Sequence, residues 1–204
     1  MANRETQTRE RILLAALALF GEQGIAATSL NQVAERAGVT RVTVYRHFAD
    51  KEQLAREAFL RVEQAFVEGA RELNRNPRAP IEDVLNGIGE RLSAMPRSDP
   101  FARMEELKRL YPDVYGEVQQ VRVVTLNGLF EHLFARAERG KMLRPGLNRR
   151  MVQAIFWELV INFFDNPKFK SLGLSDAELF RALTDVFLYG IFKNRAIRIR
   201  KVAR

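Results

Sequence analysis

Residues 28–51 read TSLNQVAERAGVTRVTVYRHFADK, and this segment contains the clearest signals of secondary structure in the chain. Ser29 with Gln32 three positions later is a capping-box pattern that predicts the start of a short helix. Thr28 is the alternative cap. Gly38 supplies the left-handed residue that ends this helix. The stretch therefore begins with one short helix and a tight turn.

A second short helix follows the turn. Thr40 can cap it, and it is expected to run over residues 41–48. On a helical wheel Val44 and Phe48 fall together and predict the buried side. The opposite side mixes long donors, a hydroxyl, a phenol and a methyl-bearing group: Arg41, Val42, Thr43, Tyr45, Arg46 and His47. Two short helices joined by a glycine-containing turn match the helix-turn-helix pattern, and this outward face suits a DNA groove.

Each side-chain type on this face predicts a contact with duplex DNA. Arg46 or Arg41 can bind guanine edges in a bidentate manner, and Val42 or Thr43 can meet a thymine methyl. Donors to phosphate position the helix without reading sequence, and the candidates are Tyr45, His47 and Lys51. The simpler alternative for each residue is a solvated group, or, for Tyr45, a ring packed against the first helix.

Apolar spacing along the rest of the chain fits helices throughout, and alternating strand patterns are nearly absent. The sequence therefore predicts an all-α protein of about nine helices. The first covers residues 6–23 and stops at Gly24. Six more are expected beyond the helix-turn-helix, over residues 50–73, 80–95, 99–110, 113–139, 148–164 and 175–192. Residues 1–50 are predicted to form a three-helix DNA-binding domain, and residues 51–204 a larger helical domain for ligand binding and dimerisation.

The last two helices are apolar around almost their whole circumference, whereas a helix on one core needs an apolar stripe of about 100°. A chain of this size can hardly cover both, so a second subunit is expected to cover one face of each. The predicted homodimer interface consists of Phe156, Glu158, Val160, Asn162, Phe163, Phe180, Leu183 and Phe187. The alternative is that both helices form the core of a monomer.

Aromatic and methionine side chains among the middle helices can line a pocket for a largely apolar small molecule. The candidates are Met104, Tyr111, Tyr115, Phe130, Phe134 and Trp157. The alternative is that they are ordinary core residues. Glu158 and Asn162, one turn apart on an apolar helix, either orient a ligand's polar group or pair across the dimer.

Composition excludes several classes of function. The 204 residues contain no cysteine and two histidines, and no glycine-rich phosphate loop, so we expect no enzyme, no metal site and no cofactor. His132 is expected to face solvent. The first eleven residues lack an apolar stretch, so neither a signal peptide nor a membrane partner is expected, and the cytoplasm is the default location.

Net charge is +8, and six basic residues with no acidic one lie in the tail, residues 193–204. The excess charge favours a polyanionic partner. The tail itself is interpreted as a phosphate-binding arm, a gate for an anionic ligand or a solubilising end. A nonspecific architectural DNA-binding protein is therefore a rival interpretation.

Residues 8–54, TRERILLAALALFGEQGIAATSLNQVAERAGVTRVTVYRHFADKEQL, resemble the N-terminal domain of TetR-family transcriptional regulators. The resemblance covers about a quarter of the chain. It implies a dimeric DNA-binding protein, usually a repressor. The helical C-terminal domain of such a protein binds a small molecule, and this changes the separation of the two DNA-binding domains in the dimer. A two-fold dimer implies a near-palindromic operator with half-sites ~34 Å or slightly more apart.

By position, the resemblance places the family's DNA contacts on a defined set of residues. Ser29 and Asn31 lie near the phosphate contacts of the second helix, and the others are Arg41, Val42, Thr43, Tyr45, Arg46, His47 and Lys51. Position 42 is often glycine, proline or another small residue in this family, whereas here it is valine. No operator sequence follows by analogy.

Overall fold

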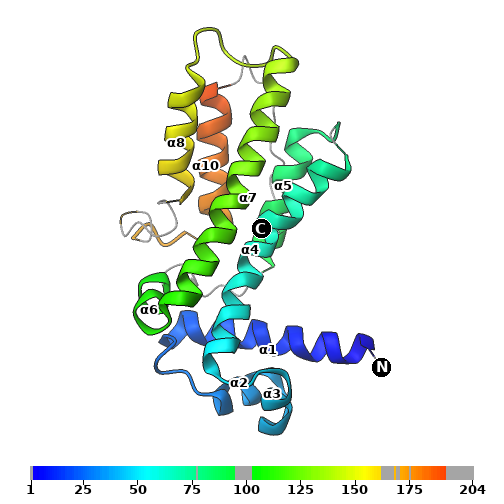
Figure 1. Cartoon of the computed structure of the whole chain (residues 1–204), viewed down its shortest axis with the longest axis vertical. Helices are drawn as coiled ribbons and strands as arrows, with labels where there is room; N and C mark the ends of the chain where they lie inside the picture. Colours follow the sequence, from blue (N-terminus) through cyan, green and yellow to red (C-terminus); the bar gives the residue numbers. More distant parts are fainter. Residues whose placement is uncertain are drawn as a thin grey trace. The chain divides into compact units, whose positions relative to one another are not determined.

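The structure, a computed structural model, describes residues 2–76, 78–94, 103–161, 168, 171–174 and 176–191 (Figure 1). Every secondary-structure element of several residues in these ranges is a helix, which confirms the all-α class. The nine helices described are α1 (Ala2–Gln23), α2 (Leu30–Ala37), α3 (Arg41–His47), α4 (Lys51–Arg75), α5 (Ile81–Ser93), α6 (Met104–Leu110), α7 (Pro112–Arg139), α8 (Arg149–Ile161) and α10 (Asp176–Ile191).

The helices fall into two compact units. The first unit comprises residues 1–63 and 95–121, and the second comprises residues 64–94 and 122–204. The first unit therefore contains the helix-turn-helix together with α6 and the start of α7, although these segments are far apart in the sequence. The functional division at residue 50 stays a prediction, because compactness alone does not assign a function.

Local capping interactions explain why α2 and α3 form where they do. The Ser29 side chain accepts from the Gln32 amide, and the Gln32 side chain accepts from the Ser29 amide at 2.8 Å, so the predicted capping box is present. Gly38 ends α2 at a φ of 65°. Thr40 caps α3 by accepting from the Thr43 amide at 3.1 Å. Helices of eight and seven residues are too short to be stable alone, so these caps matter.

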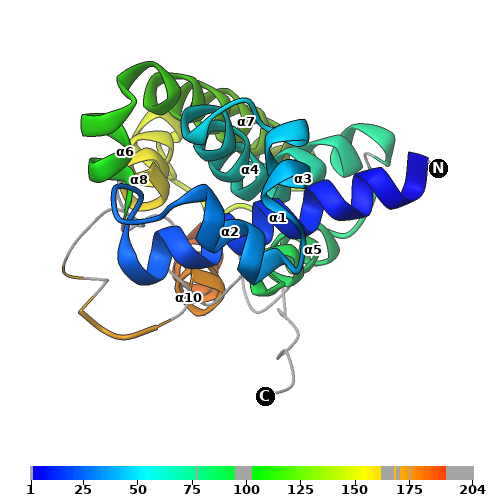
Figure 2. The ribbon, with the colours of Figure 1, turned by 90° about the horizontal axis from the view of Figure 1, so that it is seen from below.

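In the first unit α2 packs against α1 and against α3 (Figure 2). The core of this unit consists of fully buried side chains. Phe20, Val44 and Phe48 have no exposed surface. The Phe20 ring stacks on Phe59 of α4 with 6.2 Å between centroids. The inward side predicted for α3 is therefore confirmed.

In the second unit α10 packs against α5 and α8. Gly69 of α4 lies against Ile88 of α5 so closely that a β-carbon at position 69 would lie 2.6 Å from the Ile88 side chain. Phe130 of α7 stacks on Phe134 and contacts Phe156 of α8. Aromatic rings thus join α7 to α8.

Most helix boundaries lie within two residues of the predicted ones, but α1 begins at Ala2 instead of residue 6, because charged residues continue the helix beyond its apolar stripe. The predicted ends at residues 95, 99, 164, 175 and 192 lie outside the described residues. No helix in the described part of the chain combines the length and hydropathy needed to cross a membrane.

Candidate nucleic-acid interface and apolar cavity

Four residues of the outward face of α3 are exposed: Arg41, Val42, Tyr45 and Arg46. Val42 is 78% exposed, an unusual position for an apolar side chain, and Arg46 is also exposed. Val44 and Phe48 on the opposite side anchor the helix in the core. The face therefore presents an apolar contact and a guanidinium group on a rigid support, which is the combination that base-edge contacts in a major groove use.

Two contacts order the start of this face. The Arg41 guanidinium lies 5.3 Å from the centre of the Tyr45 ring and donates to the Tyr45 hydroxyl at 3.4 Å. The half-exposed Thr43 has its hydroxyl 2.9 Å from that of Thr40. Arg41 is thus held against Tyr45 one turn away, and both remain exposed.

His47 is half-buried at the end of α3. Its Nε2 atom is buried and has no hydrogen-bond partner among the residues that the structure describes. A contact between His47 and a phosphate would therefore have to use Nδ1.

Ser29 and Asn31, at the start of α2, are both exposed. The phosphate contacts that the family resemblance implies near them stay a prediction. Lys51 is placed differently from the other candidates. Its ammonium donates to three backbone carbonyls of the α1–α2 turn, those of Ile25 at 3.1 Å, Ala26 at 3.1 Å and Thr28 at 3.2 Å. An ammonium has three donors, so none remains for a phosphate contact.

The same turn is bound from α6 by a residue that the sequence analysis missed. Glu106 accepts from the amide of Ile25 at 3.0 Å and from that of Ala26 at 2.9 Å. No local pattern could reveal this contact, because 80 residues separate the partners.

Glu106 is held as a carboxylate by these contacts. Burial raises the pKa of Glu106, but the hydrogen bonds from Ala26 and Ile25, with the charges of Arg103 and Arg109, lower it below the ordinary value. The charged form therefore fits the turn better than the neutral form.

The second unit contains an apolar cavity of about 70 Å³. Thr184 is the one polar residue in its described lining, and its hydroxyl donates to the Phe180 carbonyl at 2.7 Å. The other lining residues are Phe66, Leu85, Ile88, Leu126, Leu129, Phe130, Leu133, Phe134, Ala137, Phe156, Phe180, Leu183 and Ile191. A cavity without free polar groups excludes water and suits an apolar guest.

Two of the six predicted ligand residues line this cavity. Phe130 and Phe134 line the cavity, whereas Trp157 is half-buried beside Phe156 and is not among the lining residues. Met104, Tyr111 and Tyr115 belong to the first unit. The assignment of the other four residues to a ligand site stays a prediction.

Tyr111 and Tyr115 have local partners in the first unit. Burial, followed by the carboxylates of Glu52 and Asp50, raises the pKa of the Tyr111 hydroxyl. The Tyr115 hydroxyl accepts from Gln119 at 3.0 Å. Met104 is 2% exposed and serves as a core residue.

Three of the predicted dimer residues point into their own unit. Phe156, Phe180 and Leu183 line the cavity, which corrects their assignment to an outer face. When a helix is apolar around its whole circumference, its sequence does not show which side faces the core. Glu158 is exposed, whereas Asn162, Phe163 and the side chains of Val160 and Phe187 lie outside the described residues.

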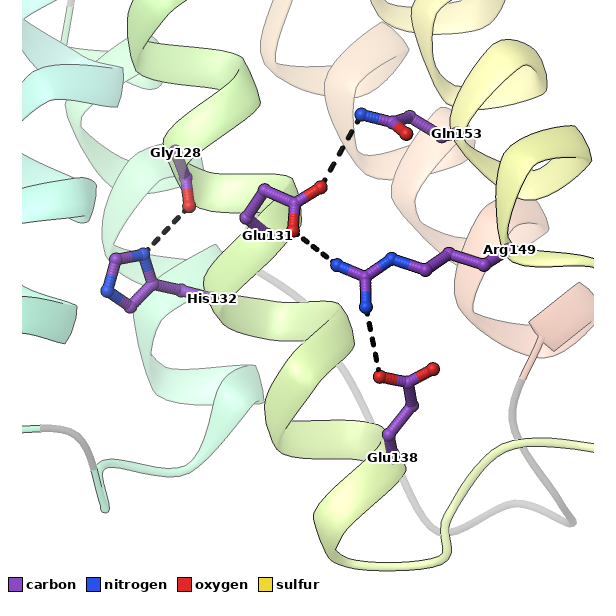
Figure 3. Close-up of polar contacts among 6 residues, drawn as sticks. All are labelled: Gly128, Glu131, His132, Glu138, Arg149 and Gln153. Carbon is purple, nitrogen blue, oxygen red and sulfur yellow. Dashed lines mark hydrogen bonds and ion pairs between the residues drawn. The ribbon is translucent and has the colours of Figure 1, made fainter.

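A polar network joins α7 to α8 on the outside of the second unit (Figure 3). Arg149 donates to Glu138 at 3.1 Å and also pairs with Glu131, which accepts from Gln153 at 3.5 Å. His132 is exposed, as expected, and its Nδ1 lies 2.9 Å from the Gly128 carbonyl oxygen (Figure 3). These are exposed pairs that fix the edge of α8.

The geometry defines a class of protein: a helical helix-turn-helix protein with a second helical unit around an apolar cavity. The family described as "Bacterial regulatory proteins, tetR family" matches residues 12–58. The transcriptional regulator AcrR of Shigella flexneri is 51% identical over 51 residues, 25% of this chain and 24% of AcrR. The transcriptional repressor KstR of Rhodococcus jostii is 33% identical over 139 residues, 67% of this chain and 62% of KstR. The matched segment, residues 12–58, is thus similar to the N-terminal part of tetR-family regulators, and these relatives support a TetR-family transcriptional regulator.

A solved structure extends the similarity over both units. NalD of Pseudomonas aeruginosa, the secondary repressor of the MexAB-OprM multidrug efflux pump, is 27% identical with a TM-score of 0.55, covering 94% of this chain and 99% of NalD. The chain spans about a quarter of the length of the first curated relatives that it matches. Activity and partners of the whole protein therefore need their own support.

Proposed function

We propose that this protein is a ligand-responsive transcriptional repressor that binds a near-palindromic DNA operator as a homodimer and is released by a small, largely apolar effector. The outward face of α3 carries the proposal, because Val42 is 78% exposed and Arg46 is exposed beside it on a helix whose other side is anchored in the core. The proposed contacts are those of Ser29, Asn31, Arg41, Val42, Thr43, Tyr45, Arg46 and His47.

The test of DNA binding starts from a randomised duplex library. The wild-type protein is expected to enrich one near-palindromic sequence, with half-sites about one helical turn apart. The rival function, a nonspecific architectural protein, predicts strongly salt-dependent binding with no enriched sequence. The basic tail, residues 193–204, which lies outside the described residues, is the feature that favours this rival.

The proposed dimer uses exposed apolar positions on α8 and α10. Met151 is 64% exposed and Ile155 is 47% exposed one turn later on α8, and Val186 on α10 is 68% exposed. Such side chains are stabilised when a second copy covers them. These three residues replace Phe156, Phe180 and Leu183 in the proposed interface.

Light scattering after size-exclusion chromatography tests the dimer with a matched pair of variants. Val186→Asp is expected to give a monomer, because a charge at the centre of an apolar interface is left unpaired. Val124→Asp is the control, since Val124 on α7 is 64% exposed but lies on neither helix of the proposed interface. A wild-type monomer, or equal effects of both variants, would contradict the proposed interface.

The cavity supports an apolar effector but has to expand to hold one. Its volume is about 70 Å³, whereas sites for drug-sized ligands span roughly 300–1,000 Å³. Effector binding would therefore separate the helices that line the cavity. A conformational change of this kind can alter the spacing of the two DNA-binding domains in the dimer. Native mass spectrometry is expected to detect a co-purified small molecule that Ala137→Leu, which fills the cavity, excludes.

We further propose that the protein catalyses no reaction. We also propose that it acts in the cytoplasm, where its operator lies. Among the described residues, no group of three or more carboxylate or histidine side chains is arranged to hold a metal ion. The regulatory nature of the family supports this assignment.

A further inference from the structure

The turn between α1 and α2 is held by two oppositely charged side chains, which we call the turn clamp: Glu106 of α6 and Lys51 at the start of α4. The Glu106 carboxylate accepts from the amides of Ile25 and Ala26, and the Lys51 ammonium donates to the carbonyls of the same two residues. Both backbone groups of each residue are therefore bound by side chains from other helices.

The turn fits its clamp closely. Gly24 has a φ of +95°, and a β-carbon there would lie 3.0 Å from the Glu106 carboxylate. Arg103, the residue immediately before α6, donates to the Gly21 carbonyl at 3.0 Å and holds the start of α6 against the end of α1. The position of the turn thus depends on α6, far along the chain.

The clamped turn leads directly into the start of α2. Lys51 also binds the carbonyl of Thr28 at 3.2 Å, and the buried Thr28 hydroxyl donates to the Gly24 carbonyl at 2.7 Å. The next residue, Ser29, is the cap of α2 and is exposed. A displacement of the turn would move Ser29 and Asn31 relative to α3.

We propose that Glu106 and Lys51 are positioning residues for DNA binding: they set the start of α2 so that it and α3 contact the same duplex together. This inference rests on the proposed function. It assigns Lys51 an indirect role, since all three donors of its ammonium are used within the turn. It also makes Glu106 a determinant of operator affinity, although it lies outside the helix-turn-helix segment.

The test compares Glu106→Gln and Lys51→Met with the control Glu105→Gln. Glu105 is the neighbouring exposed carboxylate on α6, so its substitution makes the same change in charge without touching the turn. A glutamine at position 106 keeps the size of the side chain but offers one acceptor oxygen where two amides donate. The DNA probe is the duplex that the wild-type protein selects from a randomised library.

Hydrogen exchange and DNA affinity are measured on the full-length protein. Glu106→Gln and Lys51→Met are each expected to speed exchange at the amides of Ile25 and Ala26, and to weaken binding to the selected duplex about ten-fold. The dependence of affinity on salt should keep its slope. Glu105→Gln should match the wild type in all three measurements.

The outcomes separate the possible failures. A direct phosphate contact by Lys51 would make the salt slope shallower by about one upon Lys51→Met, with exchange in the turn unchanged, and would overturn the inference. Faster exchange with unchanged affinity in Glu106→Gln would also overturn it, while the proposed function would stand. If the wild-type protein selects no duplex, the proposed function fails and the inference fails with it.

Discussion

The two units are stabilised by different means. In the first unit, short helices are fixed by caps and by charged side chains that bind backbone groups, as Lys51 and Glu106 do in the α1–α2 turn. In the second unit, longer helices pack through apolar side chains around a cavity of about 70 Å³. Directional hydrogen bonds suit a face that must hold a fixed geometry against DNA, whereas apolar packing can rearrange around a guest.

Phe48→Ala should have the largest effect on stability, and it tests whether α3 is anchored in the core of the first unit. Phe48 has no exposed surface and Arg9 lies over its ring. We expect the substitution to lower the free energy of unfolding by about 3–5 kcal/mol, measured by urea denaturation followed by circular dichroism. Val42→Ala, on the exposed side of the same helix, should change it by less than about 0.5 kcal/mol. Similar values for both would show that α3 is not anchored as described.

Arg46→Ala tests the reading face itself. If Arg46 contacts a base edge, its removal should cost roughly 1–3 kcal/mol in binding to the selected duplex and relax the preference at one base pair. Fluorescence anisotropy at fixed salt measures this change. Arg139→Ala, an exposed arginine of the second unit, is the control and should leave the affinity unchanged. Equal affinities of the Arg46 variant and the wild type would remove Arg46 from the contacts.

Glycine substitutions test the packing of the second unit. Gly69→Ala should lower the free energy of unfolding by about 1–3 kcal/mol, because its β-carbon would overlap Ile88, which is fully buried. Gly116→Ala, on α7 in the first unit, meets nothing within 4 Å and should stabilise by roughly 0.5–1 kcal/mol. Thermal unfolding of the pair measures the difference. A stabilising Gly69→Ala would mean that α4 and α5 are less closely packed.

The contributions of two carboxyl groups to the free energy of unfolding should change with pH in opposite directions. These are the smallest effects that we expect. The lowered pKa of Glu106 contributes stability above its ordinary value of 4.5, and this is lost as the pH falls through the folded pKa. Burial raises the pKa of Asp185, against the nearby Arg181, so this group destabilises the fold once the pH rises through the folded pKa. Urea midpoints followed across acidic and neutral pH should therefore fall less with acid in Glu106→Gln, and rise at neutral pH in Asp185→Asn. The reverse order would contradict both assignments.

The sequence predicted what depends on local chemistry. Ser29, Gly38 and Thr40 are capping signals that act over three or four residues, and the structure contains all three. Exposure of Val42 followed from helical periodicity, since Val44 and Phe48 are the apolar anchors.

Contacts between distant segments were beyond sequence reasoning. Glu106 meets the turn across 80 residues, and nothing near it in the sequence indicates this partner. Phe156 is equally apolar whether it lines a cavity or a dimer interface, so its inward position required the structure.

Recognition of a DNA sequence by the outward face of α3 is the central feature of the proposed function. The direct measurement is the ratio of affinities for the selected duplex and for a shuffled duplex of the same length and composition, at the same salt concentration. We predict that the wild-type protein binds the selected duplex at least about a thousand-fold more tightly. Equal affinities for the two duplexes would contradict the central claim and leave only nonspecific attraction to phosphate.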